Sequence, residues 1–381
     1  MEKIEFARPY MDELEVAAAS EVIRSGWIVN GPRLKEFEKQ FAEICGAQHA
    51  VGVSSWTTGA FLLMHSLGII AGDEVIVPSF TFIASVNVIK HLGATPVFAD
   101  INPRTLNIDP CDVVARITHK TKAVMSVDQL GFPADTIKLR EVCDRHGLML
   151  LQDAACSFGS ELSGKGMGAT SEFSIFSLHA RKIISTAEGG MITVNDASLA
   201  ERLRRLRQQG MSVSDYSRHV SAVPQFEVFD EIGYNFRMTD IQAAIGISQL
   251  AKLERILRLR HHAASFYNQR LSSFSSLDLV DSLIGAAPNW QSYSVTLNAK
   301  APISRDNLIM GLAKKGVPTK RGVMACHLQR PYLGRATGLP HTEHVSRNSL
   351  LLPMHPALSD HQLTYIVEQL AILLEETQNG D

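Results

Sequence analysis

A carboxylate and an amine stand at the ends of two predicted strands in this 381-residue chain. Asp153 closes the apolar run 148–153, and Lys182 follows the run 173–177, just before the polar, glycine-containing segment 185–190. In an open α/β sheet, ligands bind outside the carboxyl ends of the strands, so both side chains are predicted to lie at the same edge. Taken singly, Asp153 would more often cap a turn or pair with a cation, and Lys182 would more often be a solvated lysine.

Together, the two residues predict a cofactor. A lysine amine that loses its proton forms a Schiff base with a carbonyl compound. An aspartate that pairs with a pyridinium nitrogen is the second protein group that pyridoxal 5'-phosphate (PLP) requires. We therefore predict a PLP site in which Lys182 and Asp153 are the catalytic residues.

A phosphate site and a ring-stacking residue are predicted nearby. Segment 53–60 joins a predicted strand to a predicted helix at 58–67. Free N–H groups and the helix dipole attract a phosphate dianion there, while simple N-capping by Thr57 or Thr58 is the alternative. Phe82, at the end of another apolar run, offers a flat face for a cofactor ring, with a place in the core as the alternative.

The elements that position these residues alternate through the first two-thirds of the chain. The short apolar runs show no alternation with polar residues, which is typical of strands buried on both faces of a parallel sheet. Helical spacing occurs between them. The sequence therefore predicts an α/β fold with strands at 74–78, 96–99, 123–127, 148–151, 173–176 and 191–194 and helices at 34–45, 81–92 and 136–146.

Two further regions have helical spacing. Residues 11–24 are predicted to form a helix that exposes its acidic side and buries Leu14, Val16 and Ile23. From Thr239, one long helix is predicted to run towards residue 266, followed by smaller α+β elements and a final helix near 361–374. We predict a large α/β domain at residues 1–250, which includes the N-terminal helical segment, and a small C-terminal α+β domain at residues 251–381.

Composition excludes several classes of protein. The content of 45% apolar and 20% charged residues is that of an ordinary globular protein. The net charge of -2 leaves no positive surplus for nucleic acid, and no apolar run approaches the ~18 residues that cross a membrane. The N-terminal 25 residues are acidic and lack the pattern of a signal or transit peptide. Five scattered cysteines without a CxxC pair favour a reduced, cytoplasmic protein with no structural zinc.

Over nearly its whole length, the chain resembles the PLP-dependent sugar aminotransferases of the DegT/DnrJ/StrS type, which have the fold-type-I architecture. The most specific match is a Ser-x-His-x-x-Lys segment followed by Glu-Gly-Gly. The matching landmarks occur in the family's order: Ser25-Gly26, Gly31-Pro32, Phe37-Glu38, Gly72-Asp-Glu-Val-Ile-Val-Pro78, Gly93-Ala-Thr-Pro-Val-Phe98, Asp153-Ala-Ala155, Ser177-Leu-His-Ala-Arg-Lys182, Glu188-Gly-Gly190 and Gly233-Tyr-Asn-Phe-Arg-Met-Thr-Asp240.

The resemblance implies roles for individual residues. Lys182 would carry PLP as a Schiff base, and Asp153 would pair with the ring nitrogen. The remaining implied cofactor contacts are Ser177, Trp56 and Thr57 at the phosphate, Phe82 on the ring, Cys156 near the phenolic oxygen, and Asn235 at the phosphate from a neighbouring subunit. His327 would face the substrate, and His179 would lie near the site.

The chain departs from the family pattern at three places. Trp56 replaces a usual glycine, and Cys156 replaces a Gln or His, although a thiol is a poorer hydrogen-bond partner than an amide. The segment 322–326 replaces a common Tyr-Pro-Pro sequence before His327.

The activity that the resemblance implies is transfer of an amino group from an amino acid, L-glutamate being the expected donor, to a nucleotide-linked keto-deoxysugar. The pathway would be surface polysaccharide or glycosylated metabolite biosynthesis, with pyridoxamine 5'-phosphate in the second half-reaction. A homodimer with shared sites is expected, without nucleic-acid or membrane partners. The alternatives are a PLP-binding regulatory protein without turnover and a PLP-dependent sugar dehydratase. Such a dehydratase has a histidine in place of the lysine, whereas this chain has Lys182.

The arginine-rich stretch 202–207 is interpreted as a solvated helix face, with a diphosphate contact as the alternative.

Overall fold

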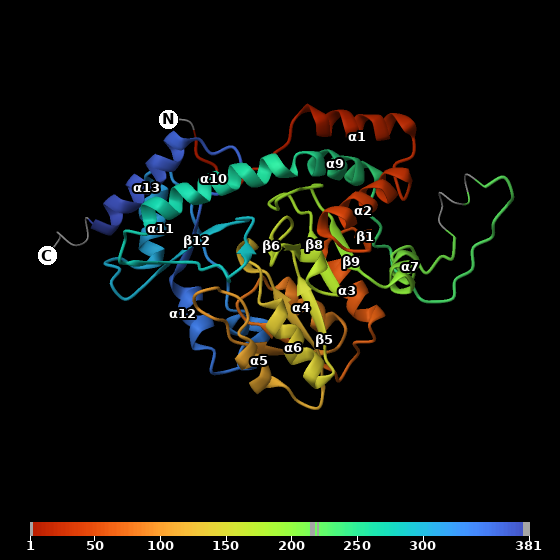
Figure 1. The fold of residues 1–381 in the computed structure, drawn as a ribbon, viewed down its shortest axis with the longest axis horizontal. Coiled ribbons are helices and arrows are strands. Elements are labelled where there is room, and N and C mark those ends of the chain that lie inside the picture. The colour runs from red at the N-terminus through yellow and green to blue at the C-terminus, as the bar shows by residue number, and fades with distance from the viewer. Residues whose placement is uncertain (1–2, 214–217, 219–220, 376–381) are drawn as a thin grey trace.

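A mostly parallel sheet forms the centre of the molecule in the computed structural model, which describes residues 3–213, 218 and 221–375 (Figure 1). Within these residues the larger sheet has seven strands. β9 runs antiparallel to β1 and β8, whereas the neighbours from β8 to β3 are parallel to one another. Their spatial order is β1 (His49–Val53), β9 (Gly190–Val194), β8 (Phe173–Ser177), β5 (Met149–Asp153), β4 (Thr121–Val127), β2 (Glu74–Pro78) and β3 (Thr95–Ala99).

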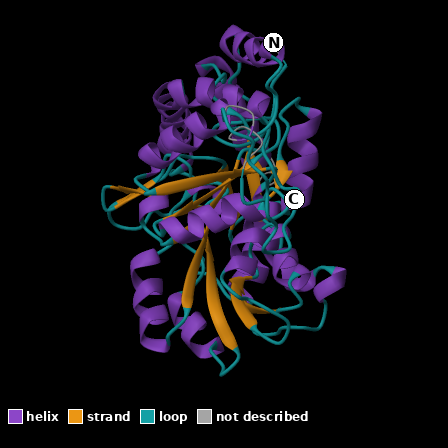
Figure 2. Ribbon diagram, turned by 90° about the vertical axis from the view of Figure 1, so that its right-hand side faces the viewer, coloured by secondary structure: helices purple, strands orange, loops and turns teal. Residues whose placement is uncertain are grey.

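Both faces of this sheet are covered by helices, as the unbroken apolar runs predict (Figure 2). Successive side chains of a strand point to opposite faces. In β2, Val75 and Val77 accordingly join one core cluster and Ile76 joins another, and all three are fully buried. The helices of this part are α2 (Pro32–Cys45), α3 (Trp56–Ser66), α4 (Ala84–His91), α5 (Pro110–Arg116), α6 (Thr136–His146) and α7 (Ala197–Leu206). The predicted α/β class is therefore confirmed.

The first helix, α1 (Glu13–Ser25), lies with the opposite face inward from the one predicted. Leu14, Val16 and Ile23 are 56%, 57% and 59% exposed, whereas Glu15 is 4% exposed. The reason is an ion pair across the chain, in which Lys252 Nζ lies 2.6 Å from Glu15 Oε1. This contact turns Glu15 towards α9 (Asp240–Ala251), beside which α1 lies in Figure 1, whereas Glu13 is exposed as predicted.

The single long helix predicted from Thr239 is two helices. α9 ends at Ala251, and α10 (Leu253–Leu271) starts after Lys252. The following elements surround a second sheet, and the predicted C-terminal helix is confirmed as α13. The sheet order is β10 (Leu277–Leu279), β12 (Tyr293–Leu297), β14 (Ser349–Leu352) and β13 (Lys320–Arg321), with helices α11 (Arg305–Lys314), α12 (Pro340–Asn348) and α13 (Asp360–Glu375).

The buried residues around this second sheet come from positions 263–374, with one addition from the N-terminus, Ile4. The first residues of the chain thus pack against elements near its end. The division into domains at residue 250 stays a prediction. A small third sheet consists of β6 (Glu161–Leu162), β7 (Lys165–Gly166) and β11 (Ala286–Ala287). Within residues 3–213, 218 and 221–375, no helix is long and apolar enough to cross a membrane.

Candidate active site

The carboxyl ends of β5 and β8 open into a cavity of about 500 Å³. Asp153 is the last residue of β5 and Ser177 the last of β8, so both reach this edge of the sheet, where ligands of open α/β folds bind. The predicted site residues that line the cavity are Trp56, Thr57, Phe82, Asp153, Cys156, Ser177, His179 and Lys182. The structure therefore brings together eight residues that the sequence analysis selected.

Asp153 is a desolvated carboxyl group at the inner end of the cavity. It is 4% exposed, and burial raises its pKa to about 6. Donors counteract this rise by stabilising the ionised form. Ser85 Oγ donates to Oδ2 at 2.7 Å, the Ala155 amide donates to Oδ1 at 3.1 Å, and the Trp56 side chain also lowers the pKa. The charge of Lys182 acts in the same direction. A cation brought into the cavity would therefore stabilise the ionised form of this carboxylate strongly.

Lys182 lies in the loop between β8 and β9. The loop is closed by main-chain hydrogen bonds from Leu178 to Gly189 and from Thr186 to Leu178, at 2.9 and 3.0 Å. Lys182 Nζ donates to the sulfur of Cys156 at 3.1 Å. The cysteine that departs from the family pattern is thus a direct neighbour of the amine.

The start of α3 forms one wall of the cavity. Ser55 is the N-cap residue, because its hydroxyl accepts from the Thr58 amide at 3.1 Å and Thr58 Oγ1 accepts from the Ser55 amide at 3.0 Å. Capping therefore uses Ser55 and Thr58, and Thr57 lines the cavity. The Trp56 indole is 6% exposed and donates to the Ile175 carbonyl at 3.1 Å, so it packs under this turn.

The Glu-Gly-Gly segment is explained by a close approach to this helix start. A Cβ atom at Gly190 would lie 2.5 Å from the Ser55 carbonyl oxygen. Only a residue without a side chain lets β9 pass α3 at this distance. Glu188, two residues earlier, lies 3.8 Å from His179 Nε2 at the side of the cavity.

Phe82 and Ser85 flank the cavity at the start of α4. The Phe82 ring is 63% exposed, so it is not a core residue, and it lines the cavity. Ser85 was missed by the sequence analysis, although it holds Asp153 and also lies 3.0 Å from Thr81 Oγ1. The predicted helix 81–92 gave no signal that distinguishes this serine from its neighbours, because its partner is distant in sequence.

Two predicted site residues do not line the cavity. His327 is 2% exposed; its Nδ1 lies 2.6 Å from Ser79 Oγ, and its Nε2 lies 3.5 Å from Glu343 Oε1. The substrate contact of His327 stays a prediction. Within the protein, its two ring nitrogens face Ser79 and Glu343. Asn235 is exposed and pairs through its backbone with Gln208, so its predicted contact with a second subunit also stays a prediction.

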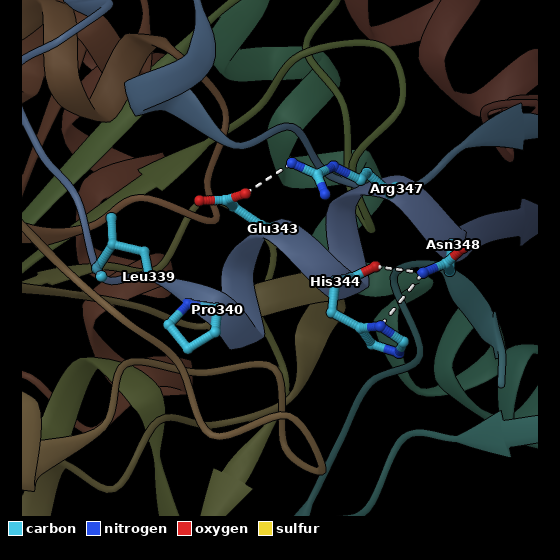
Figure 3. Close-up of a pocket in the computed structure, with 7 residues that line it drawn as sticks. Leu339, Pro340, Glu343, His344, Arg347 and Asn348 are labelled. Atoms are coloured by element: carbon cyan, nitrogen blue, oxygen red, sulfur yellow. Dashed lines mark hydrogen bonds and ion pairs between the residues drawn. The ribbon is translucent and has the colours of Figure 1, made fainter. Parts of the chain in front are cut away.

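A second, smaller cavity of about 340 Å³ lies beside α12 (Figure 3). Its charged side chains already pair with each other, because Arg347 Nη2 lies 2.6 Å from Glu343 Oε2. Asn348 Nδ2 likewise donates to the His344 carbonyl at 2.9 Å. This cavity brings together no set of groups suited to catalysis.

The arginine-rich stretch 202–207 contributes to the framework. Arg207 is 5% exposed and pairs with the buried Glu38, and Arg204 pairs with the same carboxylate. Arg202 lies 2.8 Å from Glu231. The stretch is therefore not a fully solvated face, and none of its residues lines the larger cavity; a diphosphate contact there stays an untested alternative.

The residues around the larger cavity fit PLP. A buried carboxylate can take the cationic ring nitrogen, Lys182 supplies the amine, and the first turn of α3 supplies amide donors for a phosphate. The cavity volume also lies within the ~300–1,000 Å³ that is usual for sites of small ligands.

Known proteins match the whole fold. The chain is 34% identical to the aminotransferase TlmJ from Streptoalloteichus hindustanus, with a TM-score of 0.91 over 98% of this chain and 99% of that one. It is 30% identical to DesI, solved in the presence of its TDP-sugar product, with a TM-score of 0.89 over 100% and 95% of the two chains. The putative sugar aminotransferase Spr1654 from Streptococcus pneumoniae is 27% identical in its pyridoxamine phosphate form, with a TM-score of 0.92 over 98% and 100%, and it is also known in a PLP form.

The sequence profile of the DegT/DnrJ/EryC1/StrS aminotransferase family matches residues 9–371. This span includes every landmark of the resemblance and all lining residues of the larger cavity except Phe6 and Ala7. The expected fold type, the cofactor and the class of enzyme are therefore confirmed. The chain belongs to the DegT/DnrJ/EryC1/StrS aminotransferase family and is a PLP-dependent sugar aminotransferase.

Proposed function

We propose that this enzyme moves an amino group from L-glutamate to a keto-deoxysugar carried on a nucleoside diphosphate, in surface polysaccharide or glycosylated metabolite biosynthesis. The observation that carries the proposal is the charge of the cavity lining. Four lysines and arginines line it (Arg181, Lys182, Lys320 and Arg321), against the two carboxylates Asp153 and Glu188. Such a cavity favours an anionic substrate. The TDP-sugar product of DesI, a similar protein, supports the same substrate class.

In this proposal, bound PLP supplies the carbonyl carbon that exchanges amines and a ring that withdraws electrons. Lys182 Nζ would hold the cofactor and would act as the base and acid that moves the proton between the donor and the cofactor. The neighbouring Cys156 thiol, at 3.1 Å, gives this amine a weak acceptor and no formal counter-charge.

The remaining cavity residues hold the cofactor in this proposal. Asp153 keeps the ring nitrogen protonated through its own negative charge, and Ser85 and the Ala155 amide fix the carboxylate. Phe82 would offer its face to the ring, and Cys156 would contact the phenolic oxygen. Ser177, Thr57 and the amides of the first turn of α3, which starts at Trp56, bind the phosphate.

We also propose that the active unit is a homodimer in which Asn235 reaches the cofactor phosphate of the partner subunit. Asn235 is exposed and lies outside its own cavity, as a residue that serves another subunit must. Apolar side chains are exposed on the outer face of α1 and in the segment 223–232 after α7. Exposed apolar surface of this kind marks interaction sites, and identical subunits most often pair with two-fold symmetry.

Two half-reactions test the proposal separately. Glutamate added to the PLP-loaded enzyme should convert the cofactor to its amine form and release 2-oxoglutarate, both measurable without any sugar. A nucleoside-diphosphate-linked 3-keto- or 4-keto-6-deoxyhexose should then restore the PLP spectrum and yield an amino sugar detectable by mass spectrometry. The Lys182→Ala variant is the matched control.

The outcomes separate the alternatives. An enzyme that accepts glutamate and rejects all nucleotide-linked keto sugars would contradict the substrate proposal while remaining an aminotransferase. A protein that retains PLP yet accepts no amino donor would support the regulatory alternative. Loss of water from the sugar without amino transfer would support the dehydratase alternative.

A further inference from the structure

The outer part of the cavity contains a segment that the sequence analysis assigned no role. Phe6 and Ala7 line the cavity, and they belong to residues 4–7, which we call the N-terminal strap. Ile4 is buried in the core around the second sheet, and the Phe6 carbonyl accepts from the Met354 amide at 3.2 Å. The strap is therefore fixed at both sides of Glu5, and the Phe6 ring has a defined place.

Lys320 lies directly over this ring. Its Nζ is 4.6 Å from the centroid of Phe6, within the range of a cation–π contact. Such a contact attracts the ammonium group without neutralising it, because the ring carries no net charge. In the part of the chain that the structure describes, no carboxylate oxygen lies within 4.0 Å of Lys320 Nζ.

The adjacent residue shows that this arrangement is specific to Lys320. Successive side chains in a strand point to opposite faces, and Arg321 accordingly extends to Asp306, with Nη2 and Oδ2 2.8 Å apart. One cation of β13 is thus compensated by a carboxylate, and the other faces an aromatic ring beside the cavity. Both lie at an exposed strand, so the Lys320 ammonium is open to a ligand.

We propose that Lys320 binds the diphosphate of the nucleotide-linked substrate and that Phe6 is the positioning residue that holds its ammonium group at the cavity mouth. This inference rests on the proposed function, and it names the group that separates nucleotide-linked sugars from free sugars. Discrimination between nucleotide-linked and free sugars then depends on two segments that are distant in sequence, the strap and β13, and that lie away from the reacting atoms.

Binding of UDP and dTDP to the PLP-loaded enzyme, measured by calorimetry, tests the proposal, with uridine and thymidine as probes that lack phosphate. We expect Lys320→Gln to weaken binding of both diphosphates about tenfold or more, since a charge-assisted contact is lost, and to leave nucleoside binding unchanged. Lys320→Arg should restore most of the affinity. Phe6→Leu, which keeps an apolar side chain without a π face, should weaken diphosphate binding about threefold.

The matched control is Lys300→Gln, an exposed lysine outside the cavity lining, which should leave diphosphate binding unchanged. In steady-state assays, Lys320→Gln should raise KM for the keto sugar nucleotide and change kcat little. Diphosphate affinity in Lys320→Gln equal to that in Lys300→Gln would overturn the proposal.

The test also separates this inference from the proposed function. Normal diphosphate binding by Lys320→Gln, with amination of a nucleotide-linked keto sugar by the wild-type enzyme, would refute the role of Lys320 alone. A wild-type enzyme that binds neither diphosphate while it still converts glutamate would refute both the inference and the nucleotide-linked substrate. Lys320-dependent diphosphate binding without amination of any offered sugar would support the inference and count against the proposed sugar.

Discussion

The cavity has two regions of different construction. The floor, which we define as Asp153, Ser85, Cys156 and Lys182, is partly or fully buried. It consists of two hydrogen-bonded pairs, Ser85 with Asp153 at 2.7 Å and Lys182 with Cys156 at 3.1 Å. The mouth, which consists of Phe6 and Lys320, is more open, and its contact is a longer 4.6 Å approach of a cation to a ring. The floor lies on the end of β5, on α4 and on the loops that follow β5 and β8, whereas the mouth joins the strap to an edge strand of the second sheet.

This difference assigns catalysis to the floor and substrate binding to the mouth. Burial raises the pKa of Asp153 to about 6, so small changes around it alter whether the group is charged. An exposed ammonium group is screened by water and salt, and its removal costs binding energy only. We therefore expect substitutions in the floor to reduce catalysis strongly and substitutions in the mouth to change substrate affinity.

The largest effect is expected for Lys182. Arginine keeps the positive charge, but it stays protonated and can serve neither as nucleophile nor as base. Lys182→Arg and Lys182→Ala should lose the absorbance of the covalently held cofactor and at least about 10⁴-fold of turnover, since both covalent and acid–base catalysis are lost. Borohydride reduction of the wild-type enzyme should fix the cofactor on the peptide that contains Lys182, identified by mass spectrometry. A reduced label on another lysine would refute the assignment of the whole floor.

The second largest effect is expected for Asp153→Asn. The amide keeps the shape and loses the charge that favours a protonated ring nitrogen, and each unit lost in the pKa of that nitrogen corresponds to about 1.4 kcal/mol. A loss of two units predicts turnover about 100-fold lower, with PLP still bound. Stopped-flow measurement of the glutamate half-reaction checks the rate. Turnover within a few-fold of wild type would place the electron-withdrawing role elsewhere.

A smaller effect is expected for Asn235→Ala, which acts on the partner subunit's site. Loss of one charge-assisted hydrogen bond to phosphate should weaken PLP retention by about 1.5–3 kcal/mol, measured by dialysis and cofactor fluorescence. Mixing this variant with Lys182→Ala should restore activity, because a mixed dimer contains one site with both residues intact. Absence of recovery, with subunit exchange verified by native mass spectrometry, would argue against a shared site.

The sequence predicted the floor better than the mouth for a physical reason. Asp153 ends one apolar run and Lys182 follows another, and strand ends of a parallel sheet meet at one edge, so the local pattern was sufficient to predict that the two residues lie together. Phe6 and Lys320 meet only because Ile4 joins the core around the second sheet, and no local pattern records that packing.

The same limit explains the errors at α1 and at the long helix. The spacing of apolar residues predicted that Leu14 faces the core, yet the ion pair between Glu15 and Lys252 decides which side is buried. That partner lies at the break between α9 and α10, which the unbroken helical pattern hid. Ser85, in α4, was missed because its importance lies wholly in a bond to Asp153 at the end of β5.

The smallest effect is expected for Ser85→Ala, and it should appear as a change in pH dependence. The Asp153 carboxyl, with its pKa raised by burial to about 6, is ionised above that pH and pairs with a cationic ring nitrogen, so PLP affinity should fall as the pH drops through about 6. The Ser85 hydroxyl donates to the ionised form and lowers this pKa. Its removal should therefore shift the midpoint upward by about one to two pH units, with affinity at pH 8 or above within a few-fold of wild type.

Titration of PLP binding to apoenzyme by fluorescence measures this midpoint, and two variants isolate its cause. Asp128, fully buried nearby with a pKa raised to about 7 by burial, also titrates in this range, so Asp153→Asn is needed to remove the Asp153 step; this change should also lower the pKa of Asp128, because the Asp153 charge contributes to raising it. Thr81→Val removes a hydroxyl that contacts Ser85 and makes no bond to the carboxylate, so it should shift the midpoint less than Ser85→Ala. A midpoint that stays in place in Ser85→Ala would mean that the Ala155 amide and the charge of Lys182 keep Asp153 ionised without the hydroxyl.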